Sequence, residues 1–163
     1  MSERIRMVNT MESWIGFSEY NKKYRKIIDL YNNQSPLPRG YKMNYTDSWC
    51  AATVTAAAFK CNLKDIFPCE CSVEKMVELA KEKKIWVESD SYNPKPADLI
   101  VYDWQDSGLG DNHGYPDHVG LVEYNTGSKM GILEGNYKDS VRRRIVHVGQ
   151  RYIRGYITPK YKD

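Results

Sequence analysis

The sequence predicts an α+β domain in which N-terminal helices pack on an antiparallel β-sheet formed by the second half of the chain. Apolar residues recur at three- and four-residue spacing before about residue 84, as in amphipathic helices. Short apolar or alternating runs bounded by turn residues follow, as in strands. Helices first and strands afterwards are typical of α+β domains. Because 163 residues suit one core, we expect a single domain over 1–163, with a helical part of about 1–84 and a sheet part of about 85–163.

Three segments of the first part are predicted to be helical. An apolar stripe over residues 17–31 ends at the turn and breaker residues 32–40. The alanine-rich run over 50–59, without Gly or Pro, predicts a buried helix with Asp47 or Ser48 as its N-cap. A third helix is expected to begin after Ser72 and to turn its apolar side chains inward: Val73, Met76, Val77, Leu79 and Ala80.

Five later runs predict the strands of the sheet: 99–102, 118–122, 130–133, 141–148 and 152–157. The Gly- and Asp-rich segment 103–116 separates the first two and predicts a long loop. Loops of that length inside a compact domain more often serve a function than not.

Composition and charge exclude several classes of protein. The net charge is only +3, from 24 Lys and Arg against 21 Asp and Glu, so we expect no nucleic-acid partner. The longest apolar stretch is too short to span a bilayer, and the first residues lack the apolar core of a secretory signal. We therefore expect a protein that is cytoplasmic as made, with no membrane insertion, reduced cysteines and no cofactor.

Cys50 is the candidate nucleophile because it falls in the first turn of a predicted helix. The unpaired N–H groups and positive dipole end at that position favour a thiolate, and the Cys50 amide could donate to an oxyanion. The alternative is an ordinary buried cysteine. Cys61, Cys69 and Cys71 are expected to be packing residues, because their spacing does not suit a closed zinc site; we predict no metal.

His118 is the candidate base, and a predicted hairpin decides what lies beside it. A three-residue loop at 125–127, with Gly127 in the left-handed position, places Glu134 opposite His118. A five-residue loop places Asn136 there instead, and a four-residue loop puts both on the wrong face. The sequence therefore leaves open which of the two orients the imidazole.

A cysteine, a histidine and a polar orienting residue together suit acyl transfer through a thioester. His113, in the Gly- and Asp-rich loop, and His147, at the end of a strand, are weaker candidates for the base. Arg142, Arg143 and Arg144 are interpreted as a solvated strand face.

Three motifs, met in this order, resemble the CHAP family (cysteine, histidine-dependent amidohydrolases/peptidases): 47–52 around Cys50, 116–122 around His118, and 134–137 followed by 141–143. The resemblance is closest to the compact forms from bacteria and phages. It implies a papain-like α+β fold, hydrolysis of an amide bond in cell-wall peptide, and catalytic positions at Cys50, His118, Glu134 and Asn136. Substrate contacts are expected at Trp49, Tyr45, Trp104 and Asp117. Residues 41–47 hold one acidic residue only, so the calcium loop of some members is not expected.

The resemblance implies that bacterial peptidoglycan is the substrate, either at the N-acetylmuramoyl-L-alanine bond or within the peptide. A protein of this kind would be a monomer that reaches the wall after release by lysis or through a secretion machine. Two alternatives remain: a papain-like cysteine hydrolase or transferase acting on a protein or small amide, and a catalytically inactive wall-binding domain.

Overall fold

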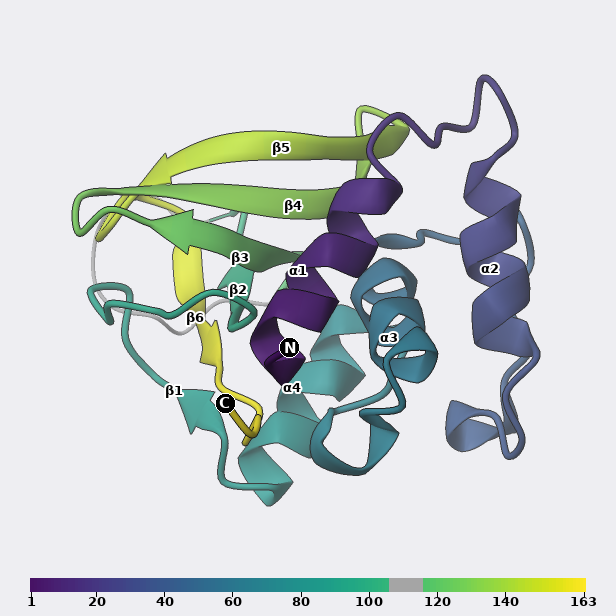
Figure 1. Cartoon of the computed structure of the whole chain (residues 1–163), viewed down its shortest axis with the longest axis horizontal. Coiled ribbons are helices and arrows are strands. Elements are labelled where there is room, and N and C mark those ends of the chain that lie inside the picture. Colours follow the sequence, from purple (N-terminus) through teal and green to yellow (C-terminus); the bar gives the residue numbers. More distant parts are fainter. Residues whose placement is uncertain (106–115) are drawn as a thin grey trace.

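Helices occupy the first half of the chain and strands the second, in a computed structural model that describes residues 1–105 and 116–163 (Figure 1). The helices are α1 (Glu3–Ser13), α2 (Tyr24–Asn32), α3 (Cys50–Lys60) and α4 (Val73–Glu82), with short 3₁₀ turns at Pro38–Gly40 and Lys64–Ile66. The strands are β1 (Trp86–Val87), β2 (Leu99–Tyr102), β3 (His118–Asn125), β4 (Lys129–Tyr137), β5 (Ser140–His147) and β6 (Ile153–Ile157). Each strand pair in the order β1-β6-β2-β3-β4-β5 is antiparallel, which confirms the predicted α+β class.

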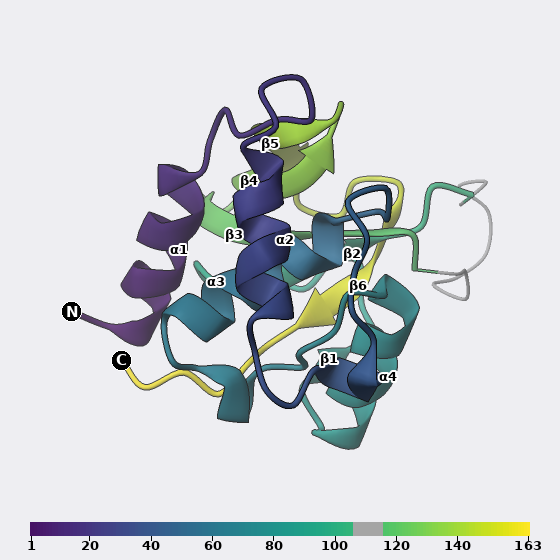
Figure 2. The ribbon, with the colours of Figure 1, turned by 90° about the vertical axis from the view of Figure 1, so that its right-hand side faces the viewer.

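Helix α3 is the centre of the main core, between α2 on one side and β3 and β4 on the other (Figures 1 and 2). Its residues 50–59 are all buried. Small side chains let it approach the sheet closely: a Cβ atom at Gly135 of β4 would lie only 2.0 Å from Oγ1 of Thr53. This contact holds the beginning of α3 beside the adjoining ends of β3 and β4.

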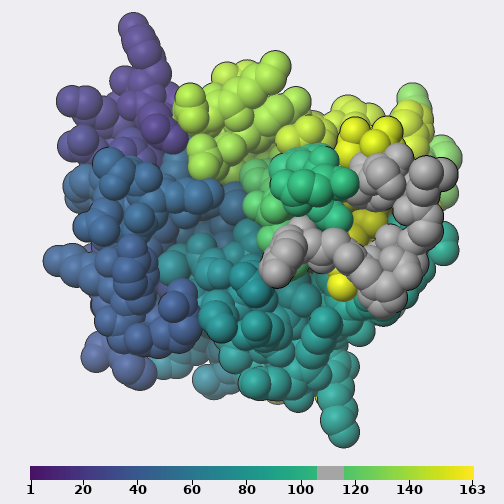
Figure 3. All heavy atoms as spheres, turned by 180° about the vertical axis from the view of Figure 1, so that it is seen from behind, coloured from purple at the N-terminus to yellow at the C-terminus, as the bar shows by residue number. Residues whose placement is uncertain are grey.

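The predicted helix over 17–31 is wrong in its first half, because α2 begins only at Tyr24. The preceding loop pairs instead with the start of β5, the edge strand. Ser18 forms a bridge with Ser140, and the amide of Glu19 donates to the carbonyl of Asp139 (2.8 Å). Hydrogen bonding to an open sheet edge outweighs the helical spacing of the aromatic residues. Figure 3 shows this early segment, in purple, against the yellow-green atoms of β5.

The caps of two helices test the predicted boundaries. The N-cap of α3 is Trp49, with no side-chain cap, so the predicted Asp47 or Ser48 cap is wrong. The Asp47 carboxylate instead accepts from the Tyr41 hydroxyl (2.7 Å) and the Asn44 amide (2.9 Å). Ser72 does cap α4, since its hydroxyl accepts from the amide of Lys75. None of the helices in the described ranges has the length and apolar character needed to cross a bilayer.

Beyond its loop, the β3–β4 hairpin has the register that was expected from a five-residue loop, although the loop itself has four residues. Asn125 pairs with Met130 across a four-residue loop, in which Gly127 has a φ of +100°. A β-bulge between Val122 and Tyr124 then inserts one residue, so Leu121 pairs with Leu133. An extra residue on one strand reverses which face each later side chain occupies relative to the partner strand. The four-residue loop alone would put Glu134 and Asn136 on the face of the sheet opposite to His118. The bulge returns both residues to the face of His118.

Candidate active site

Cys50 is the first residue of α3, and its side chain is 3% exposed. The residue before it fixes this position. Trp49 is 1% exposed, its indole N–H donates to Oε2 of Glu19 (3.0 Å), and its ring packs on Tyr24 with centroids 5.4 Å apart. The thiol thus lies at the positive end of a buried helix, at the position expected for a nucleophile.

The structure brings Cys50, His118 and Glu134 together. His118 is the first residue of β3, and its Nε2 lies 2.9 Å from Oε1 of Glu134 in β4. The charge and hydrogen bonding of the imidazole also lower the pKa of the Cys50 thiol. Because Nε2 is occupied by the carboxylate, Nδ1 is the nitrogen available to the sulfur. A proton can therefore pass between sulfur and imidazole while the carboxylate holds the ring in place.

Glu134 reaches His118 diagonally across the two strands. The pairing of Leu121 with Leu133 places Gly120, not His118, beside Glu134. A Cβ atom at Gly120 would lie 2.7 Å from Cγ of Glu134, so the glutamate side chain passes over the space that the glycine leaves. Of the two expected arrangements, the one with Glu134 directly opposite His118 is thus wrong, and the register is that of the arrangement with Asn136 opposite. The diagonal approach still brings Glu134 to His118 because Gly120 lacks a side chain.

Two further residues hold the Glu134 carboxylate, which is fully buried. The Tyr102 hydroxyl donates to Oε2 (2.8 Å), and Nε of Arg144 donates to both oxygens (3.0 and 2.9 Å). The interpretation of Arg144 as part of a solvated strand face is therefore wrong: its side chain is 25% exposed. A buried carboxylate needs a cationic or hydrogen-bonding partner, and this need is the signal that could have identified the arginine.

Asn136 lines the same hollow as His118 but is not hydrogen-bonded to it. A register shift in β4 between Glu134 and Tyr137 moves it out of the regular ladder, and its φ is +58°. Its Nδ2 lies 3.4 Å from Oγ of Ser48, two residues before the thiol. Bulges beside active sites commonly redirect a side chain in this way.

The charges of the three central groups support one another. Burial opposes ionisation of Cys50, but the hydrogen bond and charge of His118 and the backbone amides of Val119 and Ala51 lower its pKa overall. Burial likewise disfavours the imidazolium, yet hydrogen bonds and charge from Cys50 and Glu134 raise the pKa of His118 to about 10. For Glu134, His118 and then Arg144 outweigh burial and lower the pKa. These directions favour a thiolate–imidazolium pair at neutral pH.

A hollow of about 360 Å³ opens beside this network, lined by Trp104, His118, Asn136, Tyr137, Lys138 and Arg144. Trp104 is 40% exposed and stacks on Tyr102, with centroids 4.7 Å apart and planes at 13°. Asp117 accepts a hydrogen bond from the amide of Trp104 (2.8 Å), so it holds the tryptophan in place. Trp104 thus lines the hollow and Asp117 only supports it, while a contact of either residue with substrate stays a prediction.

The two other predicted substrate contacts lie elsewhere. Trp49 is buried in the core and therefore does not line the hollow. Tyr45 is 40% exposed, and its hydroxyl donates to Oδ1 of Asp29 (2.6 Å) at a separate hollow on the α2 side. Its ring meets Tyr24 edge-on at 6.3 Å, and Tyr24 in turn packs on Trp49. Tyr45 is thus connected to Cys50 only through two intervening aromatic residues.

The remaining candidates do not join the network. His147 is exposed at the end of β5, and His113 lies outside the described residues. Cys61 is buried at the opposite end of α3, and its sulfur lies 3.3 Å from Oγ1 of Thr10. Within residues 1–105 and 116–163, no cluster of three His, Cys, Asp or Glu side chains is placed to hold a metal ion.

No protein-family model matches the chain, and no curated protein matches its sequence. Its fold is similar to the crystal structure of Ly7917, which covers 96% of this chain at a TM-score of 0.54 and 16% identity. The crystal structure of Ly7917 with the hydrolyzing product of MDP covers 68% of this chain and 53% of that chain, at a TM-score of 0.44 and 17% identity. The chain spans 62% of the length of the first of these structures, and at this identity the likeness shows the fold.

Proposed function

We propose that this chain is a cysteine-dependent hydrolase of the CHAP type that cleaves an amide bond in peptidoglycan, as an amidase or an endopeptidase. The observation that carries the proposal is the network of Cys50, His118 and Glu134 at the beginning of a buried helix. The resemblance of the motifs around these residues to the CHAP family supports the choice of substrate. The likeness in fold to Ly7917 agrees with it.

In the proposed reaction, the Cys50 thiolate attacks the carbonyl carbon of the scissile amide. The charge that develops on the carbonyl oxygen is stabilised by the backbone N–H of Cys50, which is unpaired within the helix. His118 then transfers its proton to the leaving nitrogen, the C–N bond breaks, and a thioester remains on the sulfur. Neutral His118 next takes a proton from a water molecule, whose oxygen attacks the thioester and releases the acid and the thiolate.

Glu134 keeps the imidazole oriented and charged through this cycle. Its carboxylate faces Nε2, so the proton on Nδ1 is directed at the sulfur and the leaving group. Arg144 and Tyr102 hold the carboxylate from its other side, which prevents it from turning away when the imidazole becomes neutral.

Digestion of purified peptidoglycan by the wild type, Cys50→Ala and Cys61→Ala tests the proposal, with the products identified by mass spectrometry. Cys61 is the matched control, because it is a buried cysteine at the other end of the same helix. We expect identical fragments from the wild type and Cys61→Ala and none from Cys50→Ala. The fragment masses identify the bond. A wild type that releases nothing from several wall types, while Cys50 still reacts with iodoacetamide, would favour a different amide substrate.

A further inference from the structure

The hollow beside His118 has a positively charged wall. Among its lining residues, Lys138 and Arg144 carry positive charge and His118 is protonated at neutral pH, whereas none is an Asp or Glu. Glu134 lies beneath the hollow, but it is fully buried and its oxygens already accept from His118, Tyr102 and Arg144. The negative charge of Glu134 is therefore not presented to a ligand.

Arg144 has hydrogen-bond donors to spare. Only its Nε is engaged by Glu134, and its terminal Nη atoms have no hydrogen-bond partner among the described residues. Aromatic rings fix its plane, since the guanidinium carbon lies 3.9 Å from the ring centre of Tyr137 and 5.2 Å from that of Trp104. A rigid guanidinium with two free terminal nitrogens is suited to a carboxylate, which it binds through two parallel hydrogen bonds.

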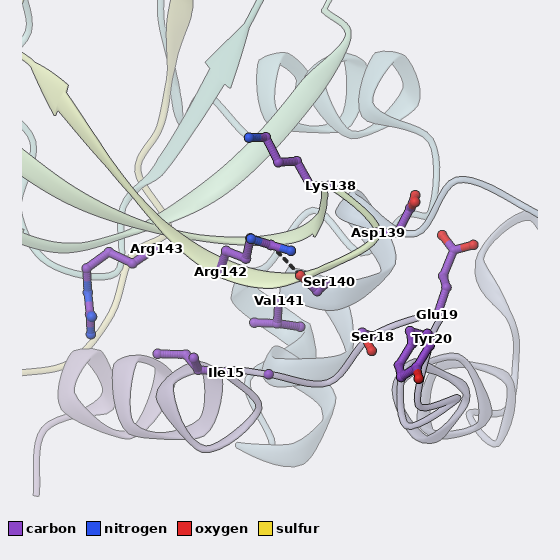
Figure 4. A pocket seen from close by; sticks show the side chains of 11 residues that line it. Ile15, Ser18, Glu19, Tyr20, Lys138, Asp139, Ser140, Val141, Arg142 and Arg143 are labelled. Atoms are coloured by element: carbon purple, nitrogen blue, oxygen red, sulfur yellow. Dashed lines mark hydrogen bonds between the residues drawn. The ribbon is translucent and has the colours of Figure 1, made fainter.

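Lys138 is the lining residue whose positive charge is not balanced by a negative partner in the described part of the chain. The Cys50–His118 ion pair is neutral overall, and so is the Glu134–Arg144 pair. Lys138 occupies the two-residue turn between β4 and β5 with a φ of +50°, and it forms no hydrogen bond or ion pair with any described residue. Lys138 also lines a second, larger hollow beneath the hairpin together with Ile15 and Arg142, and Figure 4 shows its side chain extending away from these two residues.

We propose that Arg144 and Lys138 form a subsite for a carboxylate of the substrate, close to the scissile amide. The inference rests on the proposed function and adds a specificity to it: the enzyme favours peptides with a free carboxylate over the same peptides with a carboxamide at that position. The Nη atoms of Arg144 bind the two oxygens, and Lys138 adds attraction from the rim of the hollow. Trp104 forms the adjoining apolar wall.

The test compares synthetic muropeptides that differ only in one carboxylate or carboxamide group next to the scissile bond. For the wild type we expect a kcat/KM at least about 10-fold higher on the free acid, the size of one charge-assisted contact. In Arg144→Lys and Lys138→Gln the ratio of kcat/KM on the acid to kcat/KM on the amide should fall towards one. The reason is that kcat/KM falls on the acid and changes less on the amide. Arg142→Gln is the control: Arg142 is on the same strand, its Nε donates to Ser140, and the preference should persist.

Equal cleavage of acid and amide by the wild type would overturn the subsite and leave the proposed function standing. An equal loss on both substrates in Arg144→Lys, with Lys138→Gln unchanged, would mean that Arg144 only positions Glu134. Binding to the Cys50→Ala protein, measured by calorimetry, decides the inference independently of turnover. Tighter binding of the acid supports it, and equal binding refutes it. Cleavage of neither peptide, despite tighter binding of the acid, would count against the proposed function alone.

Discussion

Replacing Glu134 with Gln tests the electrostatic account of the active site. The substitution keeps the shape of the side chain and removes the charge that faces Nε2 of His118 at 2.9 Å. A hydrogen bond to a charged group contributes about 1.5–3 kcal/mol, and one pKa unit corresponds to about 1.36 kcal/mol. The pKa of His118 should therefore fall by about one to two units from its value of about 10.

Alkylation of Cys50 by iodoacetamide over a range of pH measures this change without a substrate. In the wild type the rate should rise first when the thiolate–imidazolium pair forms. It should rise again near pH 10, where the imidazolium loses its proton and frees the thiolate. In Glu134→Gln we expect the upper inflection at about pH 8–9 and the lower inflection at higher pH than in the wild type, because a weaker imidazolium stabilises the thiolate less.

Glu123→Gln is the matched control, since Glu123 is also a strand glutamate held by an arginine of β5. It accepts from Arg143 at 2.6 and 2.8 Å, away from the hollow beside His118. Both inflections should stay in place in this variant. An upper inflection that does not move in Glu134→Gln would refute the argument that the carboxylate keeps His118 charged.

Glu134→Gln should also change the folding stability of the protein. The pKa of Glu134 is lowered in the folded state, so its contribution is present above the unfolded value of about 4.5 and is lost as the pH falls through the folded pKa. Urea unfolding should thus show Glu134→Gln less stable by about 1–2 kcal/mol at pH 7, since Arg144 is partly exposed. The difference should shrink below pH 4. A difference that persists unchanged in acid would mean that packing, not charge, is responsible.

Three other outcomes are expected. Gly120→Ala should abolish most activity by displacing Glu134. Gly131→Ala is the control and should keep the activity, because the added methyl group crowds the ring of the partly exposed Tyr124. Equal activity of the two variants would contradict the diagonal contact between Glu134 and His118. Iodoacetamide at pH 7 should label Cys50 before Cys69, because burial raises the pKa of Cys69 to about 12 whereas the pKa of Cys50 is lowered. Peptide mapping would show the order of labelling, and the reverse order would contradict the lowered pKa of Cys50. Ser72→Ala should cost about 1 kcal/mol in urea unfolding, by loss of the α4 cap, with activity retained.

Local patterns were sufficient for most elements of the fold. The stripe that follows Ser72 places Val73, Met76, Val77 and Ala80 of α4 in the core, as expected from its helical spacing, whereas Leu79 is only partly buried. Strand β2 has the predicted bounds, Leu99–Tyr102. Such patterns are reliable because burial of one face depends on spacing within the segment itself. They were insufficient for 17–23, where hydrogen bonds to β5, more than 100 residues away in the chain, determine the backbone.

The sequence by itself determined which side chains could do the chemistry: a cysteine at a helix start, a histidine at a strand start and two polar residues near the end of the next strand. Only the tertiary structure decided that Glu134, and not Asn136, is hydrogen-bonded to His118. That choice depends on a β-bulge at residue 123 and on the space left by Gly120. It also revealed Arg144 and Tyr102 as partners of Glu134. Register and long-range hydrogen bonds depend on where other strands lie, and no short stretch of sequence contains that information.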